Sequence, residues 1–222
     1  MLQNNFLQRK KDILSKLDKS SKKIWDLKII NLCDKINKNS NYYTTSSCSG
    51  RIVLMLDSEK KEEGLFIWIS HDLINLKELK EVLEKIALSP QPSPQPPALK
   101  IINNKKNLIK NKELIVNNKQ LTKDSLFKFK QEPCILHVAC EKLEGAQILL
   151  NKAKLAGWKK SGIIAFGKRF ICELNSTEKI EFPIIKNKKL LVDDGFLKLI
   201  VKKSNANLKK CWEKIEKLEK IV

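Results

Sequence analysis

Two hydrophobic segments flank the polar segment Tyr42-Tyr43-Thr44-Thr45-Ser46-Ser47-Cys48-Ser49-Gly50-Arg51. Five consecutive residues in it carry a hydroxyl or a thiol, and Ser, Gly and Arg follow them. A buried strand has little use for so many donors, so we expect a loop. Hydroxyls, backbone N–H groups beside a glycine and a guanidinium together suit a phosphate or a carboxylate. Ser, Thr and Gly alone leave open a polar connection between strands that binds nothing.

Apolar residues on either side of this segment recur at helical or strand spacing. Residues 6–18 and 24–38 have the amphipathic pattern of helices. Residues 51–57 and 65–69 are typical of two strands that pair as a hairpin. Residues 75–88 predict a third helix, with leucines on one face.

The second half of the sequence contains further strands and long helices. Residues 134–140 are typical of a buried strand, and residues 141–156 predict a helix that Gly157 ends. Three short strands and a final helix are predicted over residues 161–166, 169–174, 180–185 and about 196–222. Long helices between hairpins favour an α+β fold with a mixed or antiparallel sheet and flanking helices, not a doubly wound sheet. An internal pseudo-repeat is compatible with this pattern.

Residues 89–125 differ in composition from the rest of the chain. Residues 89–97 hold five of the seven prolines, which predicts an extended linker. Residues 98–123 carry seven Lys against one Glu. We interpret them as an insertion in a single domain that covers residues 1–222, with an RNA-gripping arm as the alternative.

The net charge of +19 favours a polyanionic partner. Of the 44 basic residues, 41 are Lys, a ratio that biased codon usage also explains. The three arginines are therefore the more informative cations, because Lys cannot replace a planar fork in bidentate recognition. They are Arg9, Arg51 and Arg169.

The sequence pattern argues against several classes of protein. No apolar run reaches 18 residues, which argues against a membrane span. Six scattered cysteines without a Cys-x-x-Cys pair argue against a zinc ribbon and indicate reduced thiols in a cytoplasm. The glycines do not form the Gly-x-Gly-x-x-Gly motif of a Rossmann cofactor site, and Walker and His-Glu-x-x-His motifs are missing.

The order of the residues in Thr44–Arg51 resembles the signature of the wybutosine-synthesis tRNA methyltransferases that act third in that pathway. Further motifs of that family follow in the expected order along nearly the whole chain, except roughly residues 89–125. They are Asp18-x-Ser20 with Asp26, Ile36-Asn37, Trp68-Ile69-Ser70-His71, Glu132-Pro133-Cys134-Ile135-Leu136-His137-Val138-Ala139-Cys140 and Ala153-x-x-Ala156-Gly157-Trp158-Lys159-Lys160-Ser161-Gly162-Ile163. Two positions depart from the family pattern: Lys22-Lys23-Ile24-Trp25 replaces Lys-Gly-Ser, and Thr44 replaces a frequent Ser.

The resemblance implies S-adenosylmethionine as cofactor and methylation of N4 of a tricyclic guanine derivative. That base lies 3′ of the anticodon in tRNA-Phe, so the implied partner is the anticodon stem-loop. A non-Rossmann methyltransferase without a metal agrees with the missing glycine motif. The chain looks more like an archaeal member, which would act on the aminocarboxypropyl form of the base.

The candidate catalytic residues are Asp26, His71 and His137. A nearby histidine or carboxylate could accept the proton that leaves the methylated nitrogen. A histidine at a strand end and an acid on a helix also have ordinary structural roles, and these alternatives stay open.

The other candidates are assigned to two binding sites. The substrate or tRNA site comprises Ser46, Ser47, Cys48, Ser49, Gly50, Arg51 and Arg169. The cofactor site comprises Cys140, Ala156, Gly157, Ser161, Gly162 and Ile163, for which a helix cap and a turn are the alternative. Trp25, Trp68 and Trp158 could stack on a base, but we favour core positions for them. A non-catalytic tRNA-binding module and an enzyme acting on a small molecule are the rival functions.

Overall fold

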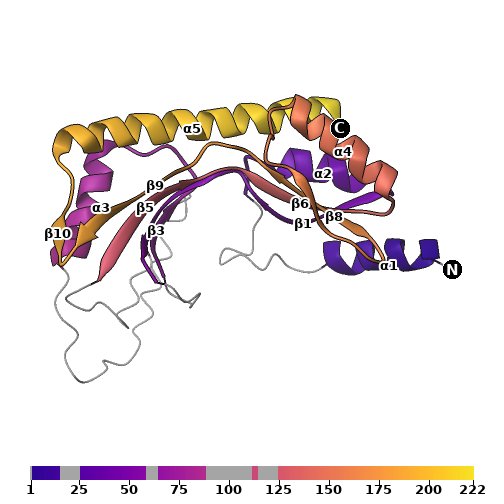
Figure 1. Cartoon of the computed structure of the whole chain (residues 1–222), viewed down its shortest axis with the longest axis horizontal. Helices are drawn as coiled ribbons and strands as arrows, with labels where there is room; N and C mark the ends of the chain where they lie inside the picture. Colours follow the sequence, from indigo (N-terminus) through magenta and orange to yellow (C-terminus); the bar gives the residue numbers. More distant parts are fainter. Residues whose placement is uncertain (1, 16–25, 59–64, 89–111, 115–124) are drawn as a thin grey trace, which may run out of the picture. The chain divides into compact units, whose positions relative to one another are not determined.

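The computed structural model describes residues 2–15, 26–58, 65–88, 112–114 and 125–222 (Figure 1). They gather into two compact units. Unit 1 comprises Met1–Gly50, Pro133–Glu178 and Asn207–Val222, and unit 2 comprises Arg51–Glu132 and Lys179–Ala206. The Pro-rich linker, most of the Lys-rich insertion and the positions Asp18, Ser20 and Lys22–Trp25 lie outside the described residues. The single domain stays a prediction.

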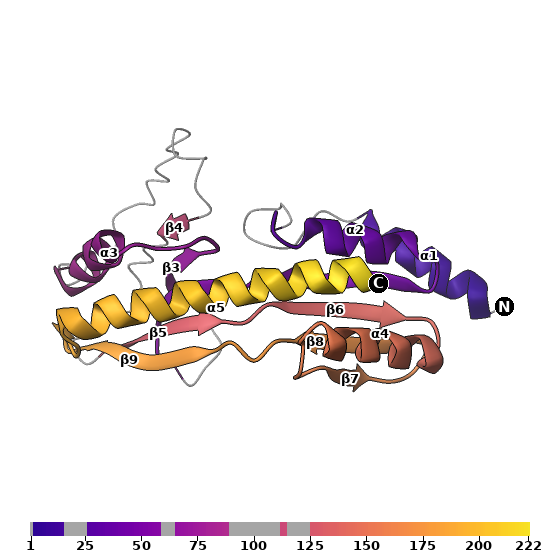
Figure 2. The same cartoon turned by 90° about the horizontal axis from the view of Figure 1, so that it is seen from above.

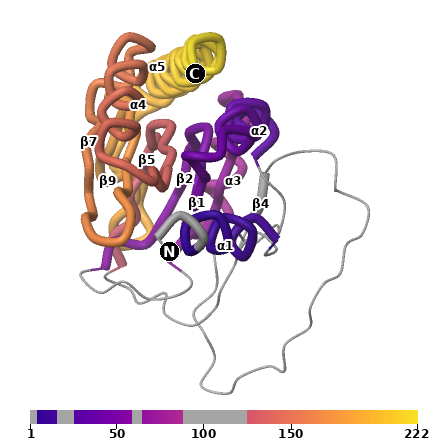
Figure 3. Tube along the Cα trace, turned by 90° about the vertical axis from the view of Figure 1, so that its right-hand side faces the viewer, coloured from indigo at the N-terminus to yellow at the C-terminus, as the bar shows by residue number. Residues whose placement is uncertain are grey.

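Unit 1 contains a four-stranded antiparallel sheet with the strand order β1-β6-β8-β7. These strands are Tyr42–Cys48, Ile135–Cys140, Phe170–Asn175 and Gly162–Ala165. The helices α2 (Ile30–Lys38) and α4 (Leu143–Leu155) cover one face, together with the residues of α5 (Asp194–Ile221) that belong to this unit (Figures 1 and 2). The helix α1 (Leu2–Leu14) lies on the opposite face (Figure 3).

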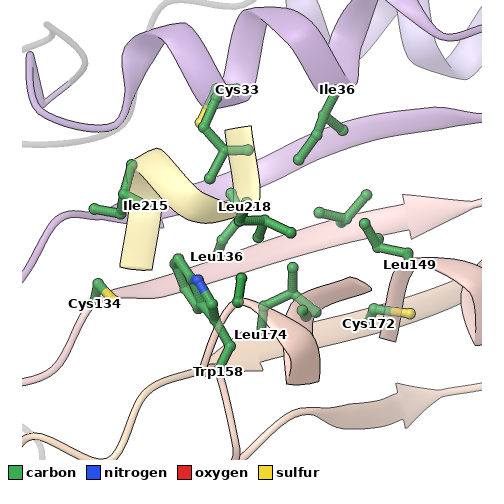
Figure 4. Close-up of a cluster of buried hydrophobic side chains, with 14 of the residues drawn as sticks. Cys33, Ile36, Cys134, Leu136, Leu149, Trp158, Cys172, Leu174, Ile215 and Leu218 are labelled. Carbon is green, nitrogen blue, oxygen red and sulfur yellow. The ribbon is translucent and has the colours of Figure 1, made fainter. Parts of the chain in front are cut away.

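The core of unit 1 lies between the sheet and the covering helices (Figure 4). Alternate residues of β6 and β8, such as Leu136 and Leu174, point to this side, because successive side chains of a strand face opposite ways. Trp158 is fully buried there, and its indole N–H donates a hydrogen bond to the carbonyl of Lys214 at 3.1 Å. The predicted core position of Trp158 is therefore confirmed.

Unit 2 contains a six-stranded antiparallel sheet with the strand order β10-β9-β5-β2-β3-β4. The strands are Lys189–Leu190, Ile180–Lys186, Leu126–Glu132, Arg51–Leu56, Phe66–Ser70 and Lys112–Leu114. The helix α3 (Leu76–Leu88) and the first residues of α5 lie along this unit. The hairpin of β2 and β3 and the core position of Trp68, which is 3% exposed, are confirmed. The described helices of the protein include none that is long and apolar enough to cross a membrane.

The α+β class with antiparallel sheets is confirmed, but the prediction of a loop over the hydroxyl-rich segment is wrong. Tyr42–Cys48 forms β1, which pairs along its length with β6. The strand is favoured because Thr and Tyr suit a pleated surface, and because its hydroxyls find partners or face solvent. Asn37 holds the buried Thr44 in this way: it accepts from the Thr44 N–H at 2.8 Å and its amide donates to Thr44 Oγ1 at 3.0 Å.

Candidate active site

A chain of three polar side chains crosses the sheet of unit 1. The hydroxyl of Ser46 lies 2.6 Å from Nδ1 of His137, and Nε2 of His137 lies 2.8 Å from a carboxylate oxygen of Glu173. Ser46 is exposed, whereas the side chains of His137 and Glu173 are only 25% and 30% exposed. One end of the chain is thus open to a ligand and the other end is shielded in part.

The register of the strands explains why these residues meet. Ser46 on β1 is opposite His137 on β6, and His137 is opposite Glu173 on β8. Directly opposed residues point to the same face of an antiparallel sheet. Their face is opposite to the one that carries Leu136 and Leu174 into the helix-covered core, because a strand alternates its side chains between the two faces.

The partners of His137 assign a role to each ring nitrogen. A carboxylate only accepts hydrogen bonds, so Nε2 of the neutral ring donates its N–H to Glu173. Nδ1 then carries the lone pair and accepts the hydroxyl proton of Ser46. A proton that reaches Nδ1 creates an imidazolium, which the Glu173 carboxylate stabilises. The arrangement therefore suits a proton acceptor that works through a hydroxyl.

Asp26 fixes the end of β1. One of its carboxylate oxygens accepts from the backbone N–H of Ser49 at 2.8 Å, and the other accepts from the N–H of Lys28 at 3.2 Å. Ser49 is fully buried, and its neighbour Gly50 has φ +99°, which a residue with a Cβ rarely adopts. Asp26 and Gly50 therefore set the direction in which the chain leaves the strand.

The other members of the predicted substrate set in unit 1 lie at the end of β1. Ser47 and Cys48 are half-buried. Burial raises the pKa of the Cys33 thiol to about 12, although a hydrogen bond from the Ser47 side chain lowers it in part. Ser47 is thus tied to the core side of the sheet, whereas Ser46 lies on the open side.

Arg51 and His71 lie in unit 2. Arg51 starts β2, and its Nε donates to Glu132 of β5 at 2.6 Å, while its guanidinium lies 4.9 Å from the centre of the Phe66 ring. His71 follows β3 directly and is half-buried. The predicted catalytic set is therefore divided between the units, with Asp26 and His137 in unit 1.

Arg169 lies in the turn between β7 and β8. Its Nε is buried and has no hydrogen-bond partner among the described residues. Burial raises the pKa of Tyr43, and the charges of Arg169 and Arg9 lower it in part, so both arginines lie near this side chain. The hydroxyl of Tyr43 also lacks a partner within the described part of the chain.

Most residues of the predicted cofactor set have structural roles. Cys140 and Ala156 are buried in the core, and Ile163 packs against the same core. Gly157 ends α4 with φ +92°. Ser161 holds a turn, since its hydroxyl donates to the carbonyl of Trp158 at 2.6 Å and accepts from the N–H of Asn175 at 3.2 Å.

Gly162 is the exception in that set. A Cβ built on it would meet no atom within 4 Å, and Gly162 lies opposite Glu173 in the sheet. It therefore leaves open space at the end of the row formed by Ser46, His137 and Glu173. The assignment of the six residues to a cofactor site stays a prediction.

Glu173 is the site residue that sequence reasoning missed. A carboxylate in the middle of Phe170–Asn175, a strand that otherwise reads as apolar, is a usable signal. The pairing of that strand with β6 brings Glu173 to His137. The local sequence pattern does not predict this pairing.

Comparisons with known proteins agree with this fold. Residues 8–222 match the family model described as Methyltransferase TYW3. A protein of Thermococcus sibiricus named tRNA(Phe) 7-((3-amino-3-carboxypropyl)-4-demethylwyosine(37)-N(4))-methyltransferase is 32% identical over 99% of this chain and 95% of its own length. A protein of Pyrococcus furiosus with the same name and the suffix 1 is 32% identical over 97% of this chain and 93% of its own length.

Solved structures give the same result. The structure titled "Structure of PH1069 protein from Pyrococcus horikoshii" superposes with a TM-score of 0.75 at 28% identity, covering 99% of this chain and 95% of that one. The names of these relatives define a class of tRNA-modifying methyltransferases. This chain belongs to the TYW3 methyltransferase family.

Proposed function

We propose that this protein transfers a methyl group from S-adenosylmethionine to N4 of a tricyclic wyosine-type base in tRNA-Phe, the base 3′ of the anticodon. The match of residues 8–222 to a methyltransferase family, whose relatives are named for this reaction, is the observation that carries the proposal. It favours an enzyme over a non-catalytic tRNA-binding module. Because tRNA is the substrate, we place the enzyme in the cytoplasm and its tRNA contact at the anticodon stem-loop.

The proposed role of the Ser46–His137–Glu173 chain is to remove the proton of the acceptor nitrogen. When bound, the donor would supply an electrophilic methyl group on a sulfonium, and a neutral thioether would leave. As the nitrogen is methylated, its proton passes to Ser46 Oγ while the proton of that hydroxyl moves to Nδ1 of His137. The resulting imidazolium keeps its Nε2–H bond to Glu173, which stabilises the new positive charge. The proton on Nδ1 then returns to Ser46 Oγ as that hydroxyl releases a proton to solvent. This step restores the neutral ring.

The proposed role of Asp26 is positioning rather than proton transfer. Its carboxylate already accepts from the N–H of Ser49, so it holds the end of the strand on which Ser46 lies. His71 stays a candidate catalytic residue on the strength of its family motif. Cross-linking of labelled RNA to His71 tests its contact with the substrate.

The proposed tRNA contacts are Arg51 and Arg169 together with the half-buried Ser47 and Cys48 at the end of β1, whereas the buried Ser49 and Gly50 would position this strand end. The Nε of Arg169 is buried, so Arg169 would contact a phosphate with its terminal guanidinium N–H groups. Arg51 already pairs with Glu132, so it would contact RNA with its remaining N–H groups.

The test is an in-vitro methylation with labelled S-adenosylmethionine and tRNA-Phe from a strain that lacks this activity. Label in the tricyclic base 3′ of the anticodon is the expected result. The His137→Ala variant should lower kcat by about 100-fold or more, the usual effect of losing a proton acceptor. No label with intact tRNA and donor would overturn the proposal, and a pure RNA-binding role would then lead.

A further inference from the structure

An exposed aromatic ring marks the hairpin of β7 and β8, which lies at one edge of the sheet of unit 1 (Figure 2). Phe166 follows β7 and is 73% exposed. Its ring meets the ring of Phe170 edge to face, with 6.2 Å between the centroids and 88° between the planes. Phe170 in turn packs against the core of unit 1. Phe170 therefore supports one side of the Phe166 ring, while the rest of the ring faces solvent.

The turn itself holds this ring at the tip of the hairpin. Gly167 has φ +148°, a conformation that favours glycine, and a Cβ built there would meet no atom within 4 Å. The residues after it are the exposed Lys168 and the half-buried Arg169. An aromatic ring is thus followed within three residues by two cations.

A third cation comes from another element of the same unit. Burial raises the pKa of Tyr43, and the charges of Arg169 and of Arg9 on α1 lower it in part, so both arginines lie near this side chain. Two of the three arginines of a chain with 41 lysines therefore gather near one side chain. A bidentate anion such as a phosphate is the ligand that arginine recognises better than lysine.

We propose that the tip of this hairpin, residues 166–169, binds single-stranded RNA, with Phe166 stacked on an unpaired base and Arg169 on the adjoining phosphate. This inference rests on the proposed function in one respect, the identity of the ligand as the tRNA substrate. Bases stack on protein aromatic rings without sequence preference, and nearby cations hold the backbone. The hairpin would so hold an unpaired nucleotide of the tRNA at the edge of the sheet.

The alternative occupant of an exposed ring at a sheet edge is a second copy of the chain. Ile164, on the same edge strand, is 56% exposed and could join Phe166 in such a contact. The cations beside Phe166 argue against it, because two copies would bring Lys168 and Arg169 of each together. RNA neutralises the same charges.

The test is the equilibrium affinity for an RNA stem-loop with the sequence of the tRNA-Phe anticodon arm. Phe166→Ala should weaken binding by roughly 5- to 100-fold. Phe166→Trp should keep the affinity and lose indole fluorescence when RNA is added. The matched control is Leu155→Ala, since Leu155 is 83% exposed at the end of α4 and should leave affinity unchanged.

Other outcomes are equally clear. Unchanged affinity of Phe166→Ala would overturn the inference, and an accompanying change of sedimentation would assign the ring to self-association. An equal loss for fully paired RNA would also overturn it, because paired bases are not free to stack. If affinity falls as expected but the wild type transfers no label, the hairpin inference stands and the proposed methylation fails.

Discussion

His137 has partners of opposite kinds on its two nitrogens, a hydroxyl on Nδ1 and a carboxylate on Nε2. The carboxylate fixes the tautomer and stabilises the protonated ring, while the exposed hydroxyl is the group that can reach a ligand. Removing either partner therefore has a different effect. Loss of Glu173 lowers the ability of the ring to accept a proton, and loss of Ser46 breaks the route to it.

Glu173→Gln and Ser46→Ala test this division at the residue scale. Glu173→Gln should lower kcat by about 10- to 100-fold and leave KM within about twofold, because the amide cannot stabilise the imidazolium as a carboxylate does. Ser46→Ala should lower kcat by about tenfold or more. The measurement is steady-state methylation by each variant, with kcat and KM determined separately.

The matched control is the neighbouring exposed residue Thr45, whose hydroxyl reaches only the backbone carbonyl of His137 at 3.5 Å. Thr45→Ala should keep kcat within about twofold of wild type. If Thr45→Ala and Ser46→Ala lose activity equally, the polar strand acts as a binding surface and not as a proton route.

At the scale of elements, Gly157 and Gly162 differ in whether the fold requires a glycine at that position. Gly157 has φ +92° at the end of α4, and a Cβ on it would lie 3.1 Å from Cε of Lys214. Gly157→Ala should cost about 1–3 kcal/mol of unfolding free energy, which lowers Tm by about 2–4 °C for each kcal/mol. Gly162→Ala should leave Tm unchanged. Calorimetry of both variants measures the difference, and equal Tm values would contradict it.

The strands β5 and β9 share an ion-pair group around Glu181, whose carboxylate lies 2.7 Å from Nζ of Lys179 and 3.0 Å from Nζ of Lys130. The hydrogen bonds from Lys179 and then Lys130 lower the pKa of Glu181 from 4.5 to about 2. A lowered carboxyl pKa stabilises the fold fully above the unfolded value near 4.5, and this contribution disappears as pH falls through about 2.

Glu181→Gln should therefore destabilise the protein by about 1 kcal/mol at pH 7, the usual scale of partly exposed pairs. Urea unfolding of both proteins at several pH values measures the difference, which should shrink below pH 4.5 and vanish near pH 2. A difference that is constant with pH would mean that Glu181 acts through packing and not through charge.

The elements that could be predicted are those with a clear period. The helix over 75–88 and the strands over 51–57 and 65–69 have such periods, and α3, β2 and β3 confirm them. The strand β5 was missed although Leu126–Glu132 alternates buried and half-buried residues, since four of its seven residues are Lys, Gln or Glu and it follows the insertion. The strand β1 was taken for a loop because a count of hydroxyls ignores the partners that a sheet supplies.

The candidate site was predictable in part for the same reason. His137 and Ser46 belong to recognisable motifs, so both could be named from the sequence. Their contact depends on the pairing of β1 with β6, and the role of Glu173 depends on the pairing of β6 with β8. Strand register is set by packing across distant segments, and a single sequence does not display it.

At the scale of the whole molecule, the net charge of +19 makes a prediction about salt. Binding of tRNA should weaken by about 10³-fold or more between 50 and 200 mM salt if about six phosphates are contacted. Arg169→Gln should reduce the slope of log affinity against log salt by about 1. Filter binding at several salt concentrations measures both. A flat dependence would leave biased codon usage as the explanation of the charge.

The three separate stretches that form unit 1 also determine when it can fold during synthesis. The ribosome releases β1 long before its partner β6, and Cys211, Ile215 and Leu218 of the core emerge later still. Until then the nascent chain carries an unpaired strand and an open apolar surface, which are the features that chaperones and proteases recognise. The yield of this enzyme in a cell therefore depends on how quickly translation passes residue 218.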